Sequence, residues 1–415
     1  MGSIHYCPPL WVLPWVVMAV GMCGWLWRVF RANKSAIIPV PPEKTDIDKL
    51  YTSIHPLTPF TWSETPPLKL RPFKPTYHLT MALQNTSISS LLVMDSTYLT
   101  RIQHRRALAR THGTEIMGHN PVARPAIHEL YAWLFGVYIP QRYPSMFTLS
   151  PSGSSTTNLV TGESIPLSPL PSPAACLELM NAHIDTEFAI LLPTSSPTSP
   201  VYDSKPPAEP EPYHLHSFLL ATPSGFNTPL KLSLPLASIH APVPGYSTRL
   251  QKSMDRFFAT LPFGKIVQRA NWSVQTDTDF FKLAGSHIAS EEPGMAPAGY
   301  EASEEEERAW AEEAARVDPE RCRLRCERQT LHRLPQTGAL VFAIKTYMYP
   351  LREVLDEGLG GEMADAVEGL GKGSVPGMKV YKRGVVWGPK VSEYLRSGGG
   401  QVTSEAKSEP EATSG

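Results

Sequence analysis

Proline is the residue that most constrains how this chain can fold. The sequence holds 42 prolines among 415 residues, well above an ordinary usage of about 5%. Because proline lacks a backbone N–H and clashes with the preceding helical turn, few of these residues can lie inside helices or strands. Much of the chain is therefore predicted to be linker and insertion. The 42% hydrophobic content still supplies the core of one large domain or two ordinary ones.

Charge and cysteine usage exclude two further classes. The 38 Lys and Arg residues nearly balance the 39 Asp and Glu residues, so no basic surface predicts a nucleic-acid partner. An odd, scattered set of cysteines is not a disulfide framework and favours a reducing compartment. These cysteines are Cys7, Cys23, Cys176, Cys322 and Cys326.

The N-terminus carries a candidate membrane anchor. No residue from Leu10 to Trp27 is charged, and at about 1.5 Å per helical residue this run just spans a thin bilayer. The basic residues Arg28, Arg31 and Lys34 follow it. The positive-inside rule then predicts a single-pass protein, anchored in the lipid bilayer by residues 10–27, with the bulk of the chain in the cytosol and the endoplasmic reticulum as the expected membrane. A signal peptide remains the alternative.

Composition divides the rest of the chain. Repeated prolines predict an extended linker over residues 35–75, and low complexity predicts a flexible C-terminal tail over 353–415. The folded domain is expected over 77–352, with insertions at 150–173, 193–212 and 284–318 where proline, serine or acidic residues dominate.

Hydrophobic periodicity predicts helices followed by antiparallel strands, which is typical of an α+β domain. The expected helices cover Ser96–Arg110, a segment starting at Pro125, and Leu250–Leu261. The expected strands are Phe188–Leu192, Tyr213–Ala221, and a hairpin that pairs Arg321–Leu331 with Gly338–Tyr349.

Three segments place polar groups beside rigid or buried backbone. Two prolines follow an imidazole in Ile239–Pro244, and Arg269–Ser273 brings together a cation, an amide and an indole. Glu327–Thr330 sets four polar residues inside a predicted strand, where buried side chains need partners. Such runs line a site or a polar network. The hydrolase and dinucleotide motifs G-x-S-x-G, H-E-x-x-H and G-x-G-x-x-G are absent.

These segments resemble the heme-dependent oxidative N-demethylase-like family. The resemblance rests on Arg325–Pro335 and Gly338–Tyr347, with further agreement at Ile239–Pro244, Arg269–Ser273 and Arg142-Tyr143-Pro144. It covers roughly Tyr77 to Leu351. The anchor, the insertions and the tail lie outside it and look like additions typical of fungal members.

The resemblance implies a PAS-like antiparallel sheet with a heme b pocket and an O2-dependent oxidation of a small secondary amine to a primary amine and formaldehyde. It also implies electrons from NADPH through flavin and iron–sulfur subunits, whose motifs this chain lacks, so a separate reductase is expected as partner. Some fungal relatives carry a His-Arg-Gln triplet where this chain has Glu327-Arg328-Gln329. Because of that difference, the substrate of those relatives is a weaker guide to the substrate of this chain.

A heme enzyme needs an axial donor, cations for the propionates and distal polar groups. The resemblance assigns His240 as the iron ligand, with His332 second, and leaves a hydrogen-bonded core histidine as the alternative. Arg269 and Arg328 are candidates for the propionates or for structural ion pairs. The candidate catalytic residues are Glu327, to hold an amine or relay a proton, and the amides Asn271 and Gln329.

Two other functions remain open at this stage. A heme-binding PAS-like module could sense gas or redox state without turnover, since a fold alone does not fix function. The chain could also be an interaction protein that docks through its proline-rich loops.

Overall fold

Two long strands form the centre of the molecule. In the computed structural model β9 (Arg323–Arg333) and β10 (Leu340–Pro350) pair antiparallel along their whole length, from Leu340 opposite Arg333 to Pro350 opposite Arg323. This confirms the predicted hairpin. Almost every residue of β9 is buried, because helices or loops cover both faces of the sheet.

The sheet extends from this hairpin to both sides. It has seven strands in the order β1-β8-β9-β10-β6-β7-β2, and every pairing is antiparallel. The other strands are β1 (Gln84–Thr86), β2 (Met117–His119), β6 (Glu187–Pro193), β7 (Tyr213–Leu219) and β8 (Ile266–Gln275). The expected α+β class is confirmed. Strands β6 and β7 confirm the strands predicted at Phe188–Leu192 and Tyr213–Ala221.

The structure describes residues 44–195, 211–288 and 302–399. The predicted transmembrane segment, residues 10–27, lies outside these ranges. Among the described helices none is long and apolar enough to cross a membrane.

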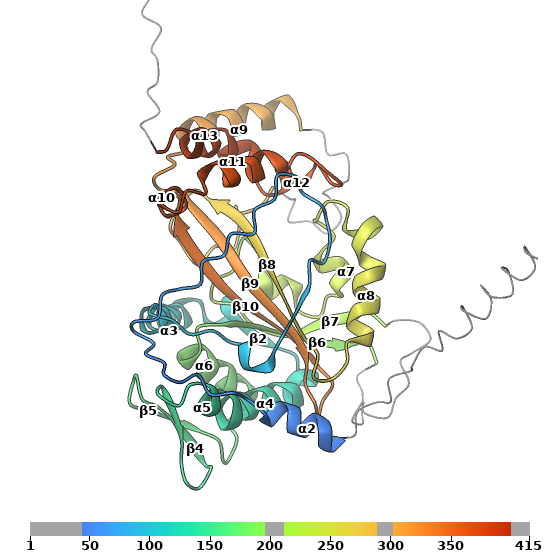
Figure 1. Ribbon diagram of the computed structural model, residues 1–415. Coiled ribbons are helices and arrows are strands. Elements are labelled where there is room, and N and C mark those ends of the chain that lie inside the picture. The colour runs from blue at the N-terminus through green and yellow to red at the C-terminus, as the bar shows by residue number, and fades with distance from the viewer. Residues whose placement is uncertain (1–43, 196–210, 289–301, 400–415) are drawn as a thin grey trace, which may run out of the picture. The chain divides into compact units, whose positions relative to one another are not determined.

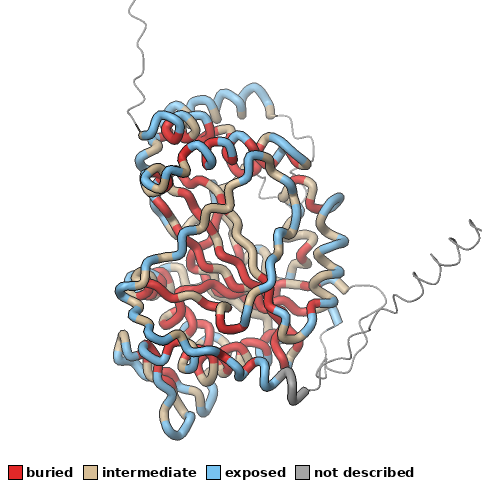
Figure 2. Tube along the Cα trace, viewed as in Figure 1, coloured by how far each residue is buried: buried red, intermediate tan, exposed pale blue. Residues whose placement is uncertain are grey.

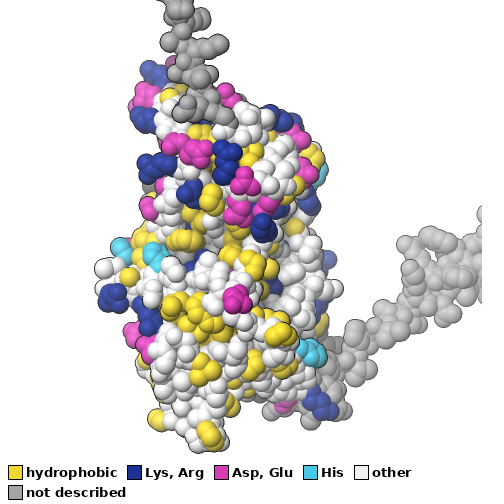
Figure 3. Space-filling model, turned by 60° about the vertical axis from the view of Figure 1, so that its left-hand side comes forward, with side chains coloured by type: hydrophobic (Ala, Val, Ile, Leu, Met, Phe, Trp, Pro, Cys, Tyr) yellow, Lys and Arg dark blue, Asp and Glu magenta, His cyan; other side chains and the backbone are white. Residues whose placement is uncertain are grey.

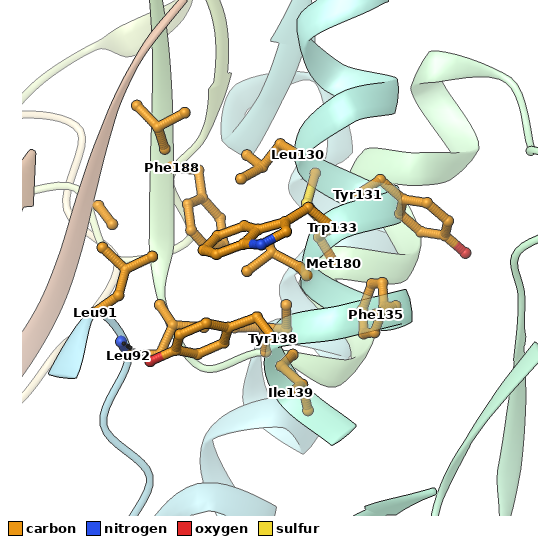
Figure 4. Close-up of a cluster of buried hydrophobic side chains, with 14 of the residues drawn as sticks. Leu91, Leu92, Leu130, Tyr131, Trp133, Phe135, Tyr138, Ile139, Met180 and Phe188 are labelled. Carbon is orange, nitrogen blue, oxygen red and sulfur yellow. Dashed lines mark hydrogen bonds between the residues drawn. The ribbon is translucent and has the colours of Figure 1, made fainter. Parts of the chain in front are cut away.

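One helical layer packs against the sheet through a large apolar core (Figure 4). Trp133 and Leu130 lie beside Phe188 of β6, and the ring of Tyr138 lies 5.1 Å from that of Trp133. The Tyr138 hydroxyl accepts a 3.0 Å hydrogen bond from the amide of Leu92. The helices of this layer are α2 (Lys44–Thr52), α3 (Tyr98–Ile116), α4 (Arg124–Trp133), the π-helical η3 (Leu134–Tyr138), α5 (Ile139–Arg142) and α6 (Pro173–His183). Beside them lies a small sheet of β3 (Phe147–Leu149), β4 (Ser155–Asn158) and β5 (Glu163–Pro166), which occupies most of the predicted insertion 150–173.

A second helical layer covers the far end of β8, β9 and β10 (Figure 1). It is built from α10 (Leu351–Asp356), α11 (Gly360–Gly369), α12 (Met378–Tyr381) and α13 (Gly384–Arg396), with the acidic α9 (Glu304–Arg316) packed on α13. Its core includes Trp387, Met363 and Val391, all buried. The predicted flexible tail is therefore wrong for residues 353–396. The many glycines misled the prediction, because several of them permit close packing rather than flexibility.

The proline-rich segment is also folded over much of its length. The predicted linker 35–75 contains α2, and both Tyr51 and Ile54 belong to the first core. Farther along, Leu70 and Phe73 pack against the second core. Figure 2 shows this segment running in extended form across the molecule. Proline prevents helix and strand pairing there, yet it does not prevent side-chain burial, so the linker prediction is wrong from Lys44 onward.

The remaining face of the sheet is covered by short elements: η5 (Thr228–Lys231), α7 (Leu236–Ile239), the π-helical η6 (Tyr246–Leu250) and α8 (Gln251–Thr260). Helix α8 confirms the third predicted helix, and the π-helical η6 leads directly into it. Leu236 and Leu261 pack with Val267 and Leu331 of the sheet. The candidate site lies between this cover and the sheet.

Candidate functional site

The pairing of β8 with β9 brings four of the predicted site residues together. Arg269 lies opposite Gln329, and Asn271 lies opposite Glu327. Because side chains alternate along a strand, residues two apart share one face. All four side chains line a cavity of about 320 Å³, which is at the lower end of the volumes of small-molecule and cofactor sites.

The walls of the cavity are mostly apolar. They come from the sheet, from the cover of α7, η6 and α8, and from the segment before β1. The apolar lining includes Leu79, Met81, Leu83, Leu191, Leu215, Leu236, Ile239, Val243, Leu250, Met254, Phe258, Val267, Leu331, Phe342 and Ile344. Polar groups in such surroundings interact more strongly than they would in water.

His240 also lines the cavity, at the end of α7. Its Nδ1 lies 2.8 Å from the carbonyl oxygen of Leu236. Because a carbonyl only accepts, Nδ1 carries the proton and Nε2 keeps a free lone pair. Burial lowers the pKa of His240, so the ring stays neutral at pH 7. The ring stacks on Tyr246 with centroids 4.9 Å apart and planes 18° apart, which fixes its orientation.

The cavity contains more positive charge than negative. Within the described residues, no carboxylate forms an ion pair with Arg269, Lys231 or Lys382. The Nε of Arg269 is buried and has no hydrogen-bond partner there. Burial lowers the pKa of Arg269, as it does for Lys231. Unpaired cations beside apolar walls are costly, and they indicate a site that takes an anionic ligand.

Hydrogen bonds fix the orientation of both amides. Gln329 donates from Nε2 to Oε2 of Glu327 at 2.9 Å, so its own oxygen is left as an acceptor. The Lys382 ammonium donates to Oδ1 of Asn271 at 3.1 Å. The Asn271 N–H groups are therefore the donors it has left. The second carboxylate in the lining, Glu187, is already bound to Arg105 and Thr222.

Several cavity residues escaped sequence reasoning, Lys231 among them, and two others are Lys382 and His287. Lys382 follows α12, inside the segment predicted to be tail, and nothing in its local pattern marks it. His287 lies between the rings of Phe226 and Tyr381, at centroid distances of 5.5 and 4.5 Å. Burial lowers the pKa of His287 to about 3, with a further contribution from nearby cations. Both residues reach the cavity through tertiary packing alone.

Two predicted residues lie on the opposite face of the sheet. Arg328 donates to the carbonyl oxygens of Ser90 and Leu91 and to Oε1 of Gln268, so the structure does not bring it to the cavity. His332 is fully buried between Tyr51 and Trp133, also away from the cavity. Each is an odd number of residues from Gln329 along β9, which turns its side chain to the other face.

A family model matches the part of the chain that forms the sheet and its cover. The model of the family described as haem-dependent oxidative N-demethylase, alpha subunit-like, matches residues 82–392. The match includes the sheet and its cover, and it extends past the predicted boundary through α12, Lys382 and most of α13. No curated protein matches the chain. The chain belongs to the haem-dependent oxidative N-demethylase, alpha subunit-like family.

Proposed function

We propose that the cavity binds heme b with His240 as the axial ligand, and that the chain oxidises a small amine with O2. The observation that carries the proposal is the pairing of a free imidazole Nε2 with unpaired cations in one apolar cavity. Heme b requires these three things: an axial donor, an apolar pocket and partners for two propionates. The residues present fit that group, with Arg269 and Lys231 as the propionate partners.

Bound heme supplies the activation of O2. The net reaction we propose converts a methylamine, O2, two electrons and two protons into the demethylated amine, formaldehyde and water. The electrons come from a separate reductase that draws on NADPH through a flavin. The apolar lining excludes bulk water from the reacting groups.

The polar residues on the sheet would orient the amine. Two carboxylates line the cavity: Glu187 is held closely by Arg105, whereas Glu327 makes a longer ion pair, 3.6 Å, with Nε of Arg325. Glu327 would accept a hydrogen bond from the amine nitrogen, and Gln329 holds the carboxylate in place. The donors of Asn271 would face an oxygen atom of the reactants.

We also propose that residues 10–27 anchor the chain in a membrane with the described domain on the cytosolic side. The uncharged run followed by Arg28, Arg31 and Lys34 supports this. The full-length chain should then sediment with membranes in alkaline carbonate, whereas a chain lacking residues 1–34 should not. Glycosylation at Asn271-Trp272-Ser273 would contradict the orientation.

Absorption spectra test the heme proposal. Purified wild type is expected to show a stoichiometric Soret band that shifts on reduction and on addition of CO. His240→Ala should lose or strongly alter this band because the axial donor is gone. His55→Ala, at an exposed site, is the matched control.

Heme binding and amine-dependent O2 uptake together distinguish an enzyme from a heme-binding sensor and from an interaction protein. Amine-dependent O2 uptake with an added reductase would support the enzyme. A normal heme spectrum without such uptake across an amine panel would favour a heme-binding sensor. A folded wild type that stays colourless when heme is supplied would contradict the heme site and favour an interaction protein.

A further inference from the structure

Lys382 is a cavity lysine that is almost fully buried and whose ammonium group is only partly hydrogen-bonded. Its side chain lines the cavity although the residue is only 4% exposed. Two of its three ammonium hydrogens are used, one by Oδ1 of Asn271 and one by the carbonyl oxygen of Trp272. A hydrogen is left over, and the described residues give it no acceptor.

The surroundings weaken the charged form of this lysine. Its two hydrogen-bond acceptors are neutral oxygen atoms. The rings of Tyr77 and Trp272, 5.7 and 5.6 Å from Nζ, favour the ammonium form and so oppose the effect of burial. Burial, together with the nearby guanidinium of Arg269, lowers the pKa of Lys382 to about 8, although Glu327 and Cys326 oppose the shift. The charged and titratable groups that face it from the neighbouring elements are Arg269, Glu327, Cys326, His287, Tyr77 and Tyr381.

Two lysines with a lowered pKa line the cavity, Lys231 and Lys382, and within the described residues only Lys382 is hydrogen-bonded to the polar face of the sheet, through Asn271. His240 and His287 are neutral near neutral pH, because burial lowers both of their pKa values. An arginine does not release its proton in this range. A protonated lysine that titrates close to the working pH meets the usual requirement for a general acid.

We propose that Lys382 is the proton donor of this cavity. The proposal rests on the heme-dependent function above, whose net reaction consumes two protons for each O2. Each proton leaves Nζ for a reactant oxygen, the amine that remains is reprotonated from solvent, and the two electrons come from the external reductase. Lys382 also donates a hydrogen bond to the amide oxygen of Asn271, so the proton donor and this amide lie side by side in the cavity.

Two measurements that need no turnover test the proposal on the full-length chain. Trace acetylation between pH 6 and 10, read by mass spectrometry, reports the titration of each lysine with or without heme. Azide binding to the ferric heme protein, read in the Soret band, reports a donor that stabilises a bound anion. The variants are Lys382→Met and Lys382→Arg, with Lys372→Met as control, since Lys372 is 61% exposed.

The expected results follow from the loss of a proton by the Lys382 ammonium group near pH 8. Acetylation of Lys382 should titrate near pH 8, far below the exposed lysines. Azide affinity of wild type should fall about 10-fold from pH 7 to pH 9 as the ammonium loses its proton. Lys382→Met should bind azide weakly at every pH and Lys382→Arg tightly at every pH, both without this transition.

Other outcomes overturn the proposal. An ordinary pKa for Lys382, or a wild-type azide profile in Lys382→Met, would do so. Loss of heme from Lys382→Met with unchanged azide behaviour in the heme that remains would instead make Lys382 a structural partner of a propionate. If wild type takes up no heme, the proposed function fails, and acetylation still reports the state of the lysine separately.

Discussion

A shift of one residue along β9 separates the cavity from the helix-facing core. Glu327 and Gln329 face the cavity, whereas Arg328 between them reaches the backbone of Ser90 and Leu91 on the other side. Charge type therefore does not reveal function here. The N–H donors of Arg328 are bound to oxygen atoms of the protein and stabilise the fold, whereas the buried Nε of Arg269 has no partner within the described residues and needs a ligand.

His332 is predicted to make the fold sensitive to acid. Burial lowers the pKa of His332 to about 3, and neither of its ring nitrogens has a partner among the described residues. The unfolded chain binds a proton near pH 6.5, whereas the folded chain does so only near 3. This contribution to stability is complete above pH 6.5 and is lost as the pH falls, by about 1.4 kcal/mol per pH unit.

Urea unfolding of His332→Leu at pH 7, 5 and 4 checks this prediction. The variant should be at least as stable as wild type at pH 7, because it removes two unpaired polar atoms from the core. Its stability should decline less steeply toward pH 4. Equal slopes for the two proteins would show that His332 does not titrate between the folded and unfolded states.

At the scale of elements, the C-terminal helices depend on glycine for close packing. Helix α11 rests against the extended segment before β1, and the Tyr77 amide donates to the carbonyl oxygen of Gly369 at 3.1 Å. Figure 3 shows charged side chains of both signs gathered over the end of the molecule that carries this layer. Its inner side is apolar and buried. The layer is thus amphipathic, as helices that cover a core must be.

Two glycines of α11 are predicted to respond in opposite ways to alanine. A Cβ at Gly369 would lie 2.6 Å from the carbonyl oxygen of Pro75, so Gly369→Ala should destabilise the protein by about 1–3 kcal/mol. A Cβ at Gly361 would meet nothing within 4 Å. Gly361→Ala should therefore stabilise the helix by up to about 1 kcal/mol. Thermal or urea unfolding of both variants measures this, and similar shifts would contradict the packing of α11 on the extended segment.

At the scale of the whole molecule, several separate parts of the chain enclose the cavity, among them the cover of α7, η6 and α8 that supplies His240. The segment before β1 supplies Tyr77 and Leu79, the sheet supplies the polar face, and α12 with the residue after it supplies Met378 and Lys382. The site is complete only when the C-terminal layer has docked. Folding and the formation of the site are therefore coupled.

Removal of residues 353–415 is predicted to disrupt the fold, not only to shorten it. The deletion would expose Trp272, Leu324 and Tyr347, which pack in the second core, and would remove Lys382. We expect loss of cooperative unfolding and binding of a hydrophobic dye, in contrast to a chain that ends at Gly399. A soluble, cooperatively unfolding chain 1–352 with an intact Soret band would contradict this role.

The sequence by itself determined the central strands, the three predicted helices and the α+β class, because these depend on local periodicity. It also determined the family, because a continuous motif carries the resemblance. It also indicated His240, Arg269, Asn271, Glu327 and Gln329 as candidates, and the structure brings them to one cavity. Only the tertiary structure decided that Arg328 and His332 face away, since the covered face of a strand depends on what packs there. Lys382 and His287 likewise became visible only in three dimensions, because local sequence carries no record of which distant segments meet.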